Sequence, residues 1–171
     1  MKALVTFLVL AALLFNVACS HRDSISYKDD VQKALEQAEL KDVTVSEDKD
    51  KNTITLGGTL HSDDAKAKAA EVAKSVANTR IIANEISVQP VGSESEAKDV
   101  ASNLDAAIEK NYKAALISSR LDKQHISFKA KNGALTLTGS VHNGNERQQA
   151  QKLAAGIPNV QQVVNQIEVR R

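Results

Sequence analysis

The 171-residue sequence predicts an α+β protein built from two tandem small domains, each with the element order helix, strand, strand, helix, strand. Two observations lead to this prediction. The chain contains a long internal repeat, and within each copy the spacing of apolar residues changes between the period of a helix and that of a strand. With 42% hydrophobic and 25% charged residues, the composition is that of a globular protein rather than a disordered one.

The internal repeat defines the domains. Shifting the sequence by 81 residues aligns two segments without a gap, and polar and glycine positions match as well as apolar ones. We therefore assign residues 26–88 to domain 1 and residues 98–171 to domain 2, with a linker at 89–97 that contains proline and glycine. The matched pairs include Leu35 and Leu116, Leu40 and Leu121, Gly58 and Gly139, His61 and His142, Asn78 and Asn159, Asn84 and Asn165, and Ile86 and Ile167.

Each copy opens with a helix whose apolar residues recur at helical spacing, and a short strand follows it. A tight turn comes next. In domain 2 this turn is Asn132-Gly133, and these residue types accept the positive φ angles of a two-residue hairpin. The residues that mark the first helix are Val31, Leu35 and Ala38 in domain 1 and Leu104, Ile108, Ala115 and Leu116 in domain 2, and the first strands are expected at 43–47 and 125–129.

The second strand of each copy alternates apolar and polar residues, which predicts one buried and one solvated face. The second helix, over residues 63–77 in domain 1, has small apolar residues at helical spacing, and Asn143 and Glu146 have capping-box spacing at the start of its counterpart. The hairpin and the following β-α-β crossover give a three-stranded mixed sheet, covered on one face by two helices. The alternating apolar residues are Ile54, Leu56 and Leu60 in domain 1 and Leu135, Leu137 and Val141 in domain 2.

These features resemble the BON family, named after osmotically inducible periplasmic and nodulation proteins. The resemblance covers nearly all of the chain after its N-terminal segment, twice, as in dual-domain periplasmic proteins and outer-membrane lipoproteins that support envelope integrity. It implies binding to phospholipid membranes and no catalysis. The residues that carry it are the strand-ending Gly58 and Gly139, the alanine-rich second helix, Asn78 and Asn159, and the final strands around Asn84-Glu85-Ile86 and Asn165-Gln166-Ile167.

The first 18 residues are predicted to be an export signal peptide. Lys2 supplies the positive charge, residues 3–15 are apolar apart from Thr6, and small residues precede Cys19. The apolar run of about 13 residues is shorter than the ~20 that a membrane-spanning helix needs. The segment therefore indicates export rather than a retained span.

Cys19 is the only cysteine, so no intramolecular disulfide can form. The stretch that ends at Cys19 resembles the lipobox of bacterial lipoproteins, in which the sulfur accepts diacylglycerol, and residues 19–25 would then be a lipidated tether. Ser20, rather than Asp, favours the outer membrane facing the periplasm. Asn16 departs from the pattern, so ordinary cleavage that releases a soluble periplasmic protein stays open as the alternative.

No catalytic residues, metal site or cofactor are predicted. A metal needs three or four converging ligands, and each copy offers one histidine, His61 or His142, for which a structural or solvated role is expected. Asn84 and Asn165 fall on the apolar face of the last strand, where their side chains should bond to neighbouring backbone. Gly58 and Gly139 should permit a close approach between helix and sheet or mark a bulge.

The charge is unevenly divided between the copies. Residues 27–88 hold 9 basic and 12 acidic residues, whereas residues 98–171 hold 11 and 6. Treated as part of the first helix of domain 2, Lys110, Lys113 and Arg120 lie within about 80° of one another, away from the apolar face. We expect them to contact an anionic phospholipid membrane. A plain solvated helix face and a periplasmic protein-interaction adaptor are the alternatives, and an exported protein is not expected to meet nucleic acid.

Overall fold

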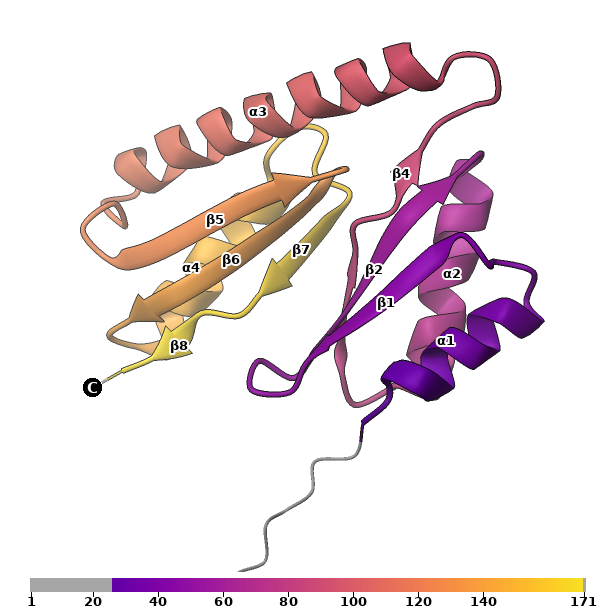
Figure 1. Ribbon diagram of the computed structural model, residues 1–171. Coiled ribbons are helices and arrows are strands. Elements are labelled where there is room, and N and C mark those ends of the chain that lie inside the picture. The colour runs from indigo at the N-terminus through magenta and orange to yellow at the C-terminus, as the bar shows by residue number, and fades with distance from the viewer. Residues whose placement is uncertain (1–25, 171) are drawn as a thin grey trace, which may run out of the picture.

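The computed structural model describes residues 26–170, and they form the two predicted α+β units (Figure 1). The element order helix, strand, strand, helix, strand holds in both. Domain 1 consists of α1 (Lys28–Gln37), β1 (Val43–Asp48), β2 (Thr53–Leu60), α2 (Asp63–Val76), β3 (Ile81–Asn84) and β4 (Ser87–Val88). Domain 2 consists of α3 (Glu94–Ser118), β5 (His125–Lys131), β6 (Ala134–Val141), α4 (Gly144–Ala155), β7 (Gln162–Asn165) and β8 (Glu168–Val169).

Each sheet is mixed, as predicted. In domain 1, β1 pairs antiparallel with β2, while β3 and β4 both pair parallel with the other side of β2. Domain 2 repeats this arrangement with β5, β6, β7 and β8. The third position of each sheet is therefore filled by two short strands. The break follows an asparagine whose side chain accepts a hydrogen bond from the backbone two residues later, Ile86 N–H at 3.4 Å on Asn84 and Ile167 N–H at 3.1 Å on Asn165.

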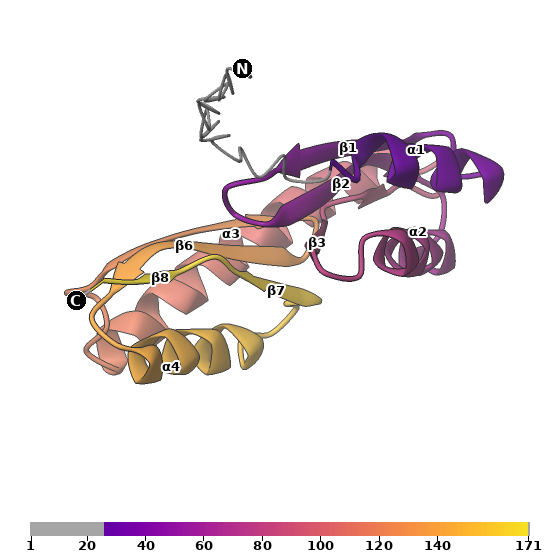
Figure 2. The ribbon, with the colours of Figure 1, turned by 90° about the horizontal axis from the view of Figure 1, so that it is seen from below.

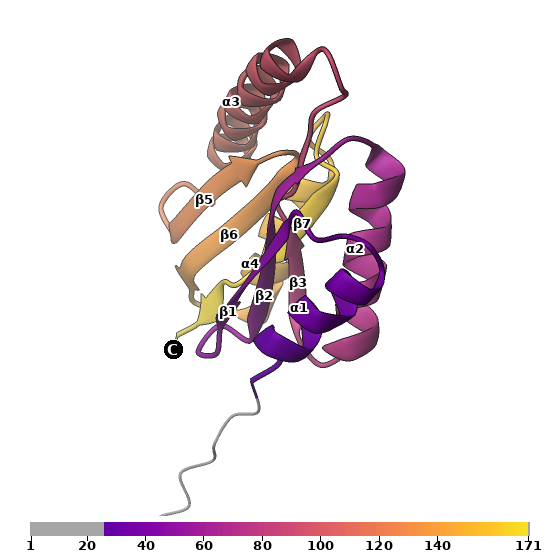
Figure 3. The same cartoon turned by 45° about the vertical axis from the view of Figure 1, so that its right-hand side comes forward.

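The hydrophobic core of each domain lies between one face of the sheet and its two helices. Figure 2 shows α4 running along one side of the domain 2 sheet, and Figure 3 shows α1 and α2 together beside the sheet of domain 1. Alternation along the strands brings their apolar residues to this face. The domain 1 core includes Val31, Leu35, Val43, Ile54, Leu56, Ala69, Ala73 and Ile86, and the domain 2 core includes Ile108, Tyr112, Leu116, Leu135, Leu137, Ala150, Ala154 and Ile167.

The buried asparagines behave as predicted. Asn84 Nδ2 donates to the backbone carbonyl of Lys66 on α2 at 2.9 Å, and Asn165 Nδ2 donates to Arg147 O on α4 at 3.4 Å and to Gln151 Oε1 at 3.1 Å. Because a buried amide without partners would be costly, these bonds fix the distance between the second helix and the last strand in both domains.

Gly58 and Gly139 allow a close backbone approach, and each lies two residues before the end of its strand. Gly58 and Gly139 have φ angles of 101° and 98°, and a Cβ atom at either position would clash with a backbone carbonyl of the neighbouring strand segment, that of Asp42 or His125. Both features require glycine. The prediction of a close approach between helix and sheet is wrong, because the close approach is between the backbones of neighbouring strand segments.

The predicted capping box is present with one change. The backbone N–H of Glu146 donates to Asn143 Oδ1 at 3.0 Å, but the Glu146 carboxylate accepts from the N–H of His142 at 2.9 Å rather than from that of Asn143. Two backbone donors at the start of α4 are therefore satisfied. In domain 1, Ser62 caps α2 by accepting from Ala65 N–H at 3.2 Å.

The first helices of the two domains differ in length. α1 has 10 residues, whereas α3 has 25 and begins at Glu94, inside the segment predicted as linker. The prediction that Leu104 belongs to the buried face is wrong, because this residue is 40% exposed. Of the three α3 residues that lie buried, the first is Ile108, so the additional N-terminal turns lie outside the core of domain 2.

Candidate functional site

The basic residues singled out in the sequence lie at the C-terminal end of α3. Lys110 and Lys113 are exposed on this helix, three residues apart. Arg120 is also exposed, but α3 ends at Ser118, so its predicted helical angle is wrong. Arg120 has φ 58° and follows the helix in a Schellman arrangement, with Leu121 N–H donating to Leu116 O at 2.9 Å.

Ile117 lies on the same helix face as the two lysines. It follows Lys110 by seven residues and Lys113 by four, and these spacings place the three side chains on one stripe of the helix. The side chain of Ile117 is 54% exposed, which is unusual for a large apolar residue in a helix that covers a core. An apolar side chain on the same stripe as two cations suits the boundary between lipid headgroups and acyl chains.

A hollow of about 330 Å³ opens beside Ile117, between the end of α3 and strand β5. Lys113 and Asp122 supply charge at this hollow, which we call the α3–β5 hollow. Behind it, the Phe128 ring packs edge-on against that of Tyr112, with centroids 5.1 Å apart. The residues that line the α3–β5 hollow are Lys113, Leu116, Ile117, Leu121, Asp122, Gln124, Ile126 and Phe128.

Two other titratable residues of α3, Tyr112 and Glu109, bond to neighbouring elements. Tyr112 is fully buried, its hydroxyl donates to Ala150 O at 3.2 Å, and burial raises its pKa. The backbone N–H of Ala130 donates to Glu109 Oε1 at 3.0 Å and lowers the pKa of this carboxyl group, helped by Lys129 at 3.2 Å. Glu109 therefore has partners on β5, and it also precedes Lys113 by four residues, so its negative charge lies beside that lysine on the helix.

The repeated histidines do not converge on a common site. His61 Nδ1 lies 2.9 Å from the carbonyl oxygen of Gln89, and His142 Nδ1 lies 3.9 Å from a carboxylate oxygen of Glu146. Within residues 26–170, no three His, Cys, Asp or Glu side chains are grouped as a metal ion would require. Each histidine lies directly after the end of its strand.

Cys19, the predicted lipid-attachment residue, lies outside the described residues. Among the helices of residues 26–170, none is both long and apolar enough to cross a bilayer.

The fold and the surface define a class of protein with two tandem α+β domains. The second domain has exposed basic and apolar side chains, Lys110, Lys113 and Ile117, near the end of α3. The family model of the BON domain matches residues 27–90 and 104–171, and the chain belongs to this family. BON domains are linked to membrane or phospholipid binding, are generally not enzymes, and are associated with the bacterial envelope. No curated protein matches the whole sequence significantly.

The comparison with solved structures found matches to CdsD, a structural protein of the type III secretion system of Chlamydia trachomatis. The C-terminal domain of CdsD is 12% identical, with a TM-score of 0.35, and the match covers 87% of this chain and 100% of that one. A second CdsD structure is 13% identical, with the same TM-score, and the match covers 84% of this chain and 61% of that one.

Proposed function

We propose that this protein is a non-enzymatic envelope protein that binds anionic phospholipid surfaces through the C-terminal end of α3 and thereby supports envelope integrity. The observation that carries the proposal is Ile117, exposed on one helix stripe with Lys110 and Lys113. A lysine or arginine near an anionic leaflet contributes about 1 kcal/mol, and a buried methylene about 0.8 kcal/mol. The three side chains together support reversible binding at the interface.

The proposal includes a lipid anchor at Cys19. A diacylglycerol-modified cysteine would hold the chain on the outer membrane, seven residues before Ser26. Labelling growing cells with a radioactive fatty acid tests this step. Wild-type protein should take up label and Cys19→Ala should not, whereas an unlabelled wild-type protein would indicate a soluble periplasmic form.

A flotation assay tests the membrane contact itself. Protein with Cys19→Ser, which lacks the acyl group, is mixed with vesicles of phosphatidylglycerol and phosphatidylcholine or with phosphatidylcholine alone. We expect binding to the anionic vesicles, weakened by salt because the attraction is screened. Equal binding to both vesicles, or no binding to either, contradicts the proposal.

A periplasmic adaptor is the second candidate. In each described sheet, β1 or β5 has a strand neighbour on one side only, and an extended peptide can add to such an edge. Charge reversal of Lys110, Lys113 and Arg120 separates the two candidates. It should abolish vesicle binding under the first and leave a strand-edge partner bound under the second.

A further inference from the structure

The two domains meet at the edges of their sheets, where β3 lies near β7. The side-chain amide of Gln162, at the start of β7, bonds twice to the backbone of β3. Its Oε1 accepts from Asn84 N–H at 2.8 Å, and its Nε2 donates to Ile82 O at 2.6 Å. Gln162 therefore occupies the hydrogen-bonding groups that β3 would otherwise offer to a further strand.

The residue after each of these strands reaches the hairpin of the opposite domain. Glu85 follows β3; its carboxylate lies 3.0 Å from Lys131 Nζ, and its carbonyl accepts from Asn132 Nδ2 at 2.8 Å. Its repeat equivalent, Gln166, follows β7 and donates to Thr53 Oγ1 at 2.8 Å, directly after the β1–β2 turn. The same element of each domain thus contacts the hairpin of the other.

The buried residues outside the two cores show the same equivalence between the domains. Four residues at 2% exposure or less belong to neither hydrophobic core: Thr53, Ala83, Ala134 and Val164. They form two pairs of repeat equivalents, Thr53 with Ala134 and Ala83 with Val164. By strand alternation they lie on the sheet face opposite the helices. Both domains therefore use one surface, and an approximate two-fold axis relates them, as in an isologous dimer.

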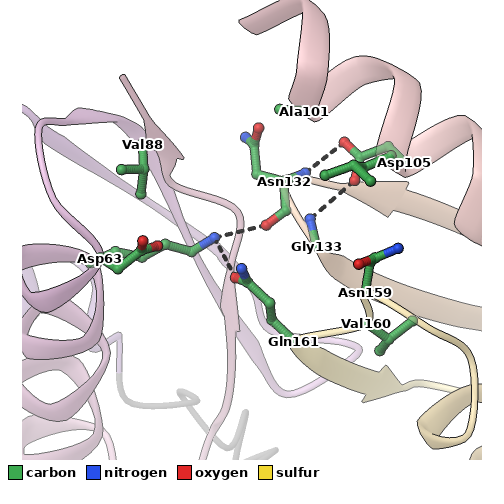
Figure 4. A pocket seen from close by; sticks show the side chains of 11 residues that line it. Asp63, Val88, Ala101, Asp105, Asn132, Gly133, Asn159, Val160 and Gln161 are labelled. Atoms are coloured by element: carbon green, nitrogen blue, oxygen red, sulfur yellow. Dashed lines mark hydrogen bonds between the residues drawn. The ribbon is translucent and has the colours of Figure 1, made fainter. Parts of the chain in front are cut away.

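Lys66 completes the interface from α2. Its ammonium donates to Asn132 O at 2.7 Å and to Gln161 Oε1 at 3.0 Å, and the residue is only 8% exposed. Figure 4 shows Asn132 and Gln161 of domain 2 opposite Asp63 and Val88 of domain 1. A cavity of about 240 Å³ remains beside these contacts. Interfaces with many polar contacts and incomplete packing are typical of domains that can separate.

The connection between the domains is short and exposed. Five residues, 89–93, join β4 to α3, and they include Pro90 and Gly92, whose φ is 86° and whose surroundings are open. Opening this turn would separate the domains without unfolding either core. It would also expose the β3 and β7 edges, which then need a new partner.

We propose that the surface shared by the two domains also docks a second copy of this chain, by exchange of domains. Domain 1 of one molecule then packs on domain 2 of another through the same contacts, because the surface is self-complementary and the connecting turn is the only covalent restraint on partner choice. The intramolecular form has the advantage of high effective concentration. Exchange is therefore expected where protein concentration is high, or where the turn cannot close.

Zero-length cross-linking between the native residues Glu85 and Lys131 tests the proposal. Equal amounts of 14N- and 15N-labelled chain with Cys19→Ser are unfolded together, refolded at high concentration and treated with a carbodiimide, which joins Glu85 to Lys131. Exchange predicts 85–131 cross-linked peptides of mixed isotope in a species of twice the monomer mass. The Glu109–Lys129 pair, at 3.2 Å within domain 2, is the matched control and must stay of single isotope.

Deletion of residues 90–92 provides a second arm. The shortened turn cannot reverse the chain between β4 and α3, so every docked interface must form between two chains. We expect a dimer in analytical ultracentrifugation, with mixed-isotope 85–131 cross-links. The proposal is overturned if mixed-isotope 85–131 peptides are absent from both arms, whether the deleted chain is then a monomer or a dimer of another kind.

Discussion

The side-chain oxygen of Gln162 accepts a hydrogen bond from the backbone N–H of Asn84 at 2.8 Å, across the boundary between the two domains. Together with the bond from Gln162 Nε2 to Ile82 O, it pairs the outer edge of β3. Gln162→Ala should leave both backbone groups without this partner and reduce the free energy of unfolding by about 1–3 kcal/mol. Urea unfolding measures the change.

The matched control is Gln149→Ala, at an exposed position on α4. Surface substitutions of this kind usually change stability by less than about 0.5 kcal/mol. A Gln162→Ala protein as stable as this control would show that the edge pairing contributes nothing measurable.

Gly139→Ala should be strongly destabilising. Its φ of 98° and the carbonyl of His125 leave no room for a Cβ atom, so the hairpin must distort. We expect a loss of at least about 2 kcal/mol. Gly144→Ala, in the first turn of α4 with open space around it, should instead gain up to about 0.5 kcal/mol. Thermal unfolding of both variants tests this prediction. Equal melting temperatures would contradict the close approach of Gly139 to the carbonyl of His125.

Asn165→Ala should weaken the contact between α4 and the last strands. It removes bonds to Arg147 O and Gln151 Oε1 and leaves the N–H of Ile167 without its acceptor. The expected loss is about 1–3 kcal/mol. Asn111→Ala, exposed on α3, is the control and should be neutral. A calorimetric difference between the two variants near zero would contradict the structural role.

The Glu109 carboxyl group should make the free energy of unfolding depend on pH in the acidic range. Its pKa is lowered in the folded state by the Ala130 N–H, so its stabilising effect is present above the unfolded pKa and is lost as pH falls through the folded pKa. Glu109→Gln should therefore be less stable than wild type at pH 7, by under about 1 kcal/mol, and the gap should shrink as pH falls below the unfolded pKa of about 4.3. Urea unfolding from pH 3 to 7 tests this, and a constant gap contradicts it.

Much of the fold could be predicted because the repeat doubles each signal. Asn84 and Asn165 fall on an apolar strand face in both copies, and parity alone predicts that they need backbone partners. Gly58 and Gly139 occur at equivalent positions of the two copies, which indicates a backbone constraint rather than chance. Local spacing and residue chemistry were sufficient for these features.

Features set by tertiary contacts could not be predicted in this way. The helix ends at Glu39 and Arg120 adopt positive φ without the glycine that usually marks them, so the sequence carried no stop signal before Arg120. Residues 94–97 at the start of α3 are mostly polar and show no apolar periodicity, which indicated a linker. Gln162 has isoleucine as its repeat equivalent, and only the packed domains show its partners on β3.

Ile117 shows the same limit at the candidate site. Its apolar side chain fits a core as well as a membrane surface, and only its exposed fraction of 54% distinguishes the two. Ile117→Ser should leave the fold intact and lower the affinity for anionic vesicles several-fold, because it removes apolar area worth about 25 cal/mol per Å² at the interface.

Val169→Ser is the control for this last change, since Val169 is 46% exposed but lies on β8, away from α3. Binding curves with phosphatidylglycerol vesicles should separate the two variants, and the lysine contribution should persist in Ile117→Ser as a remaining dependence on salt. If both variants bind as wild type does, contact at the end of α3 is electrostatic alone. If both lose affinity equally, the membrane contact lies elsewhere on the protein, and the proposed surface is wrong.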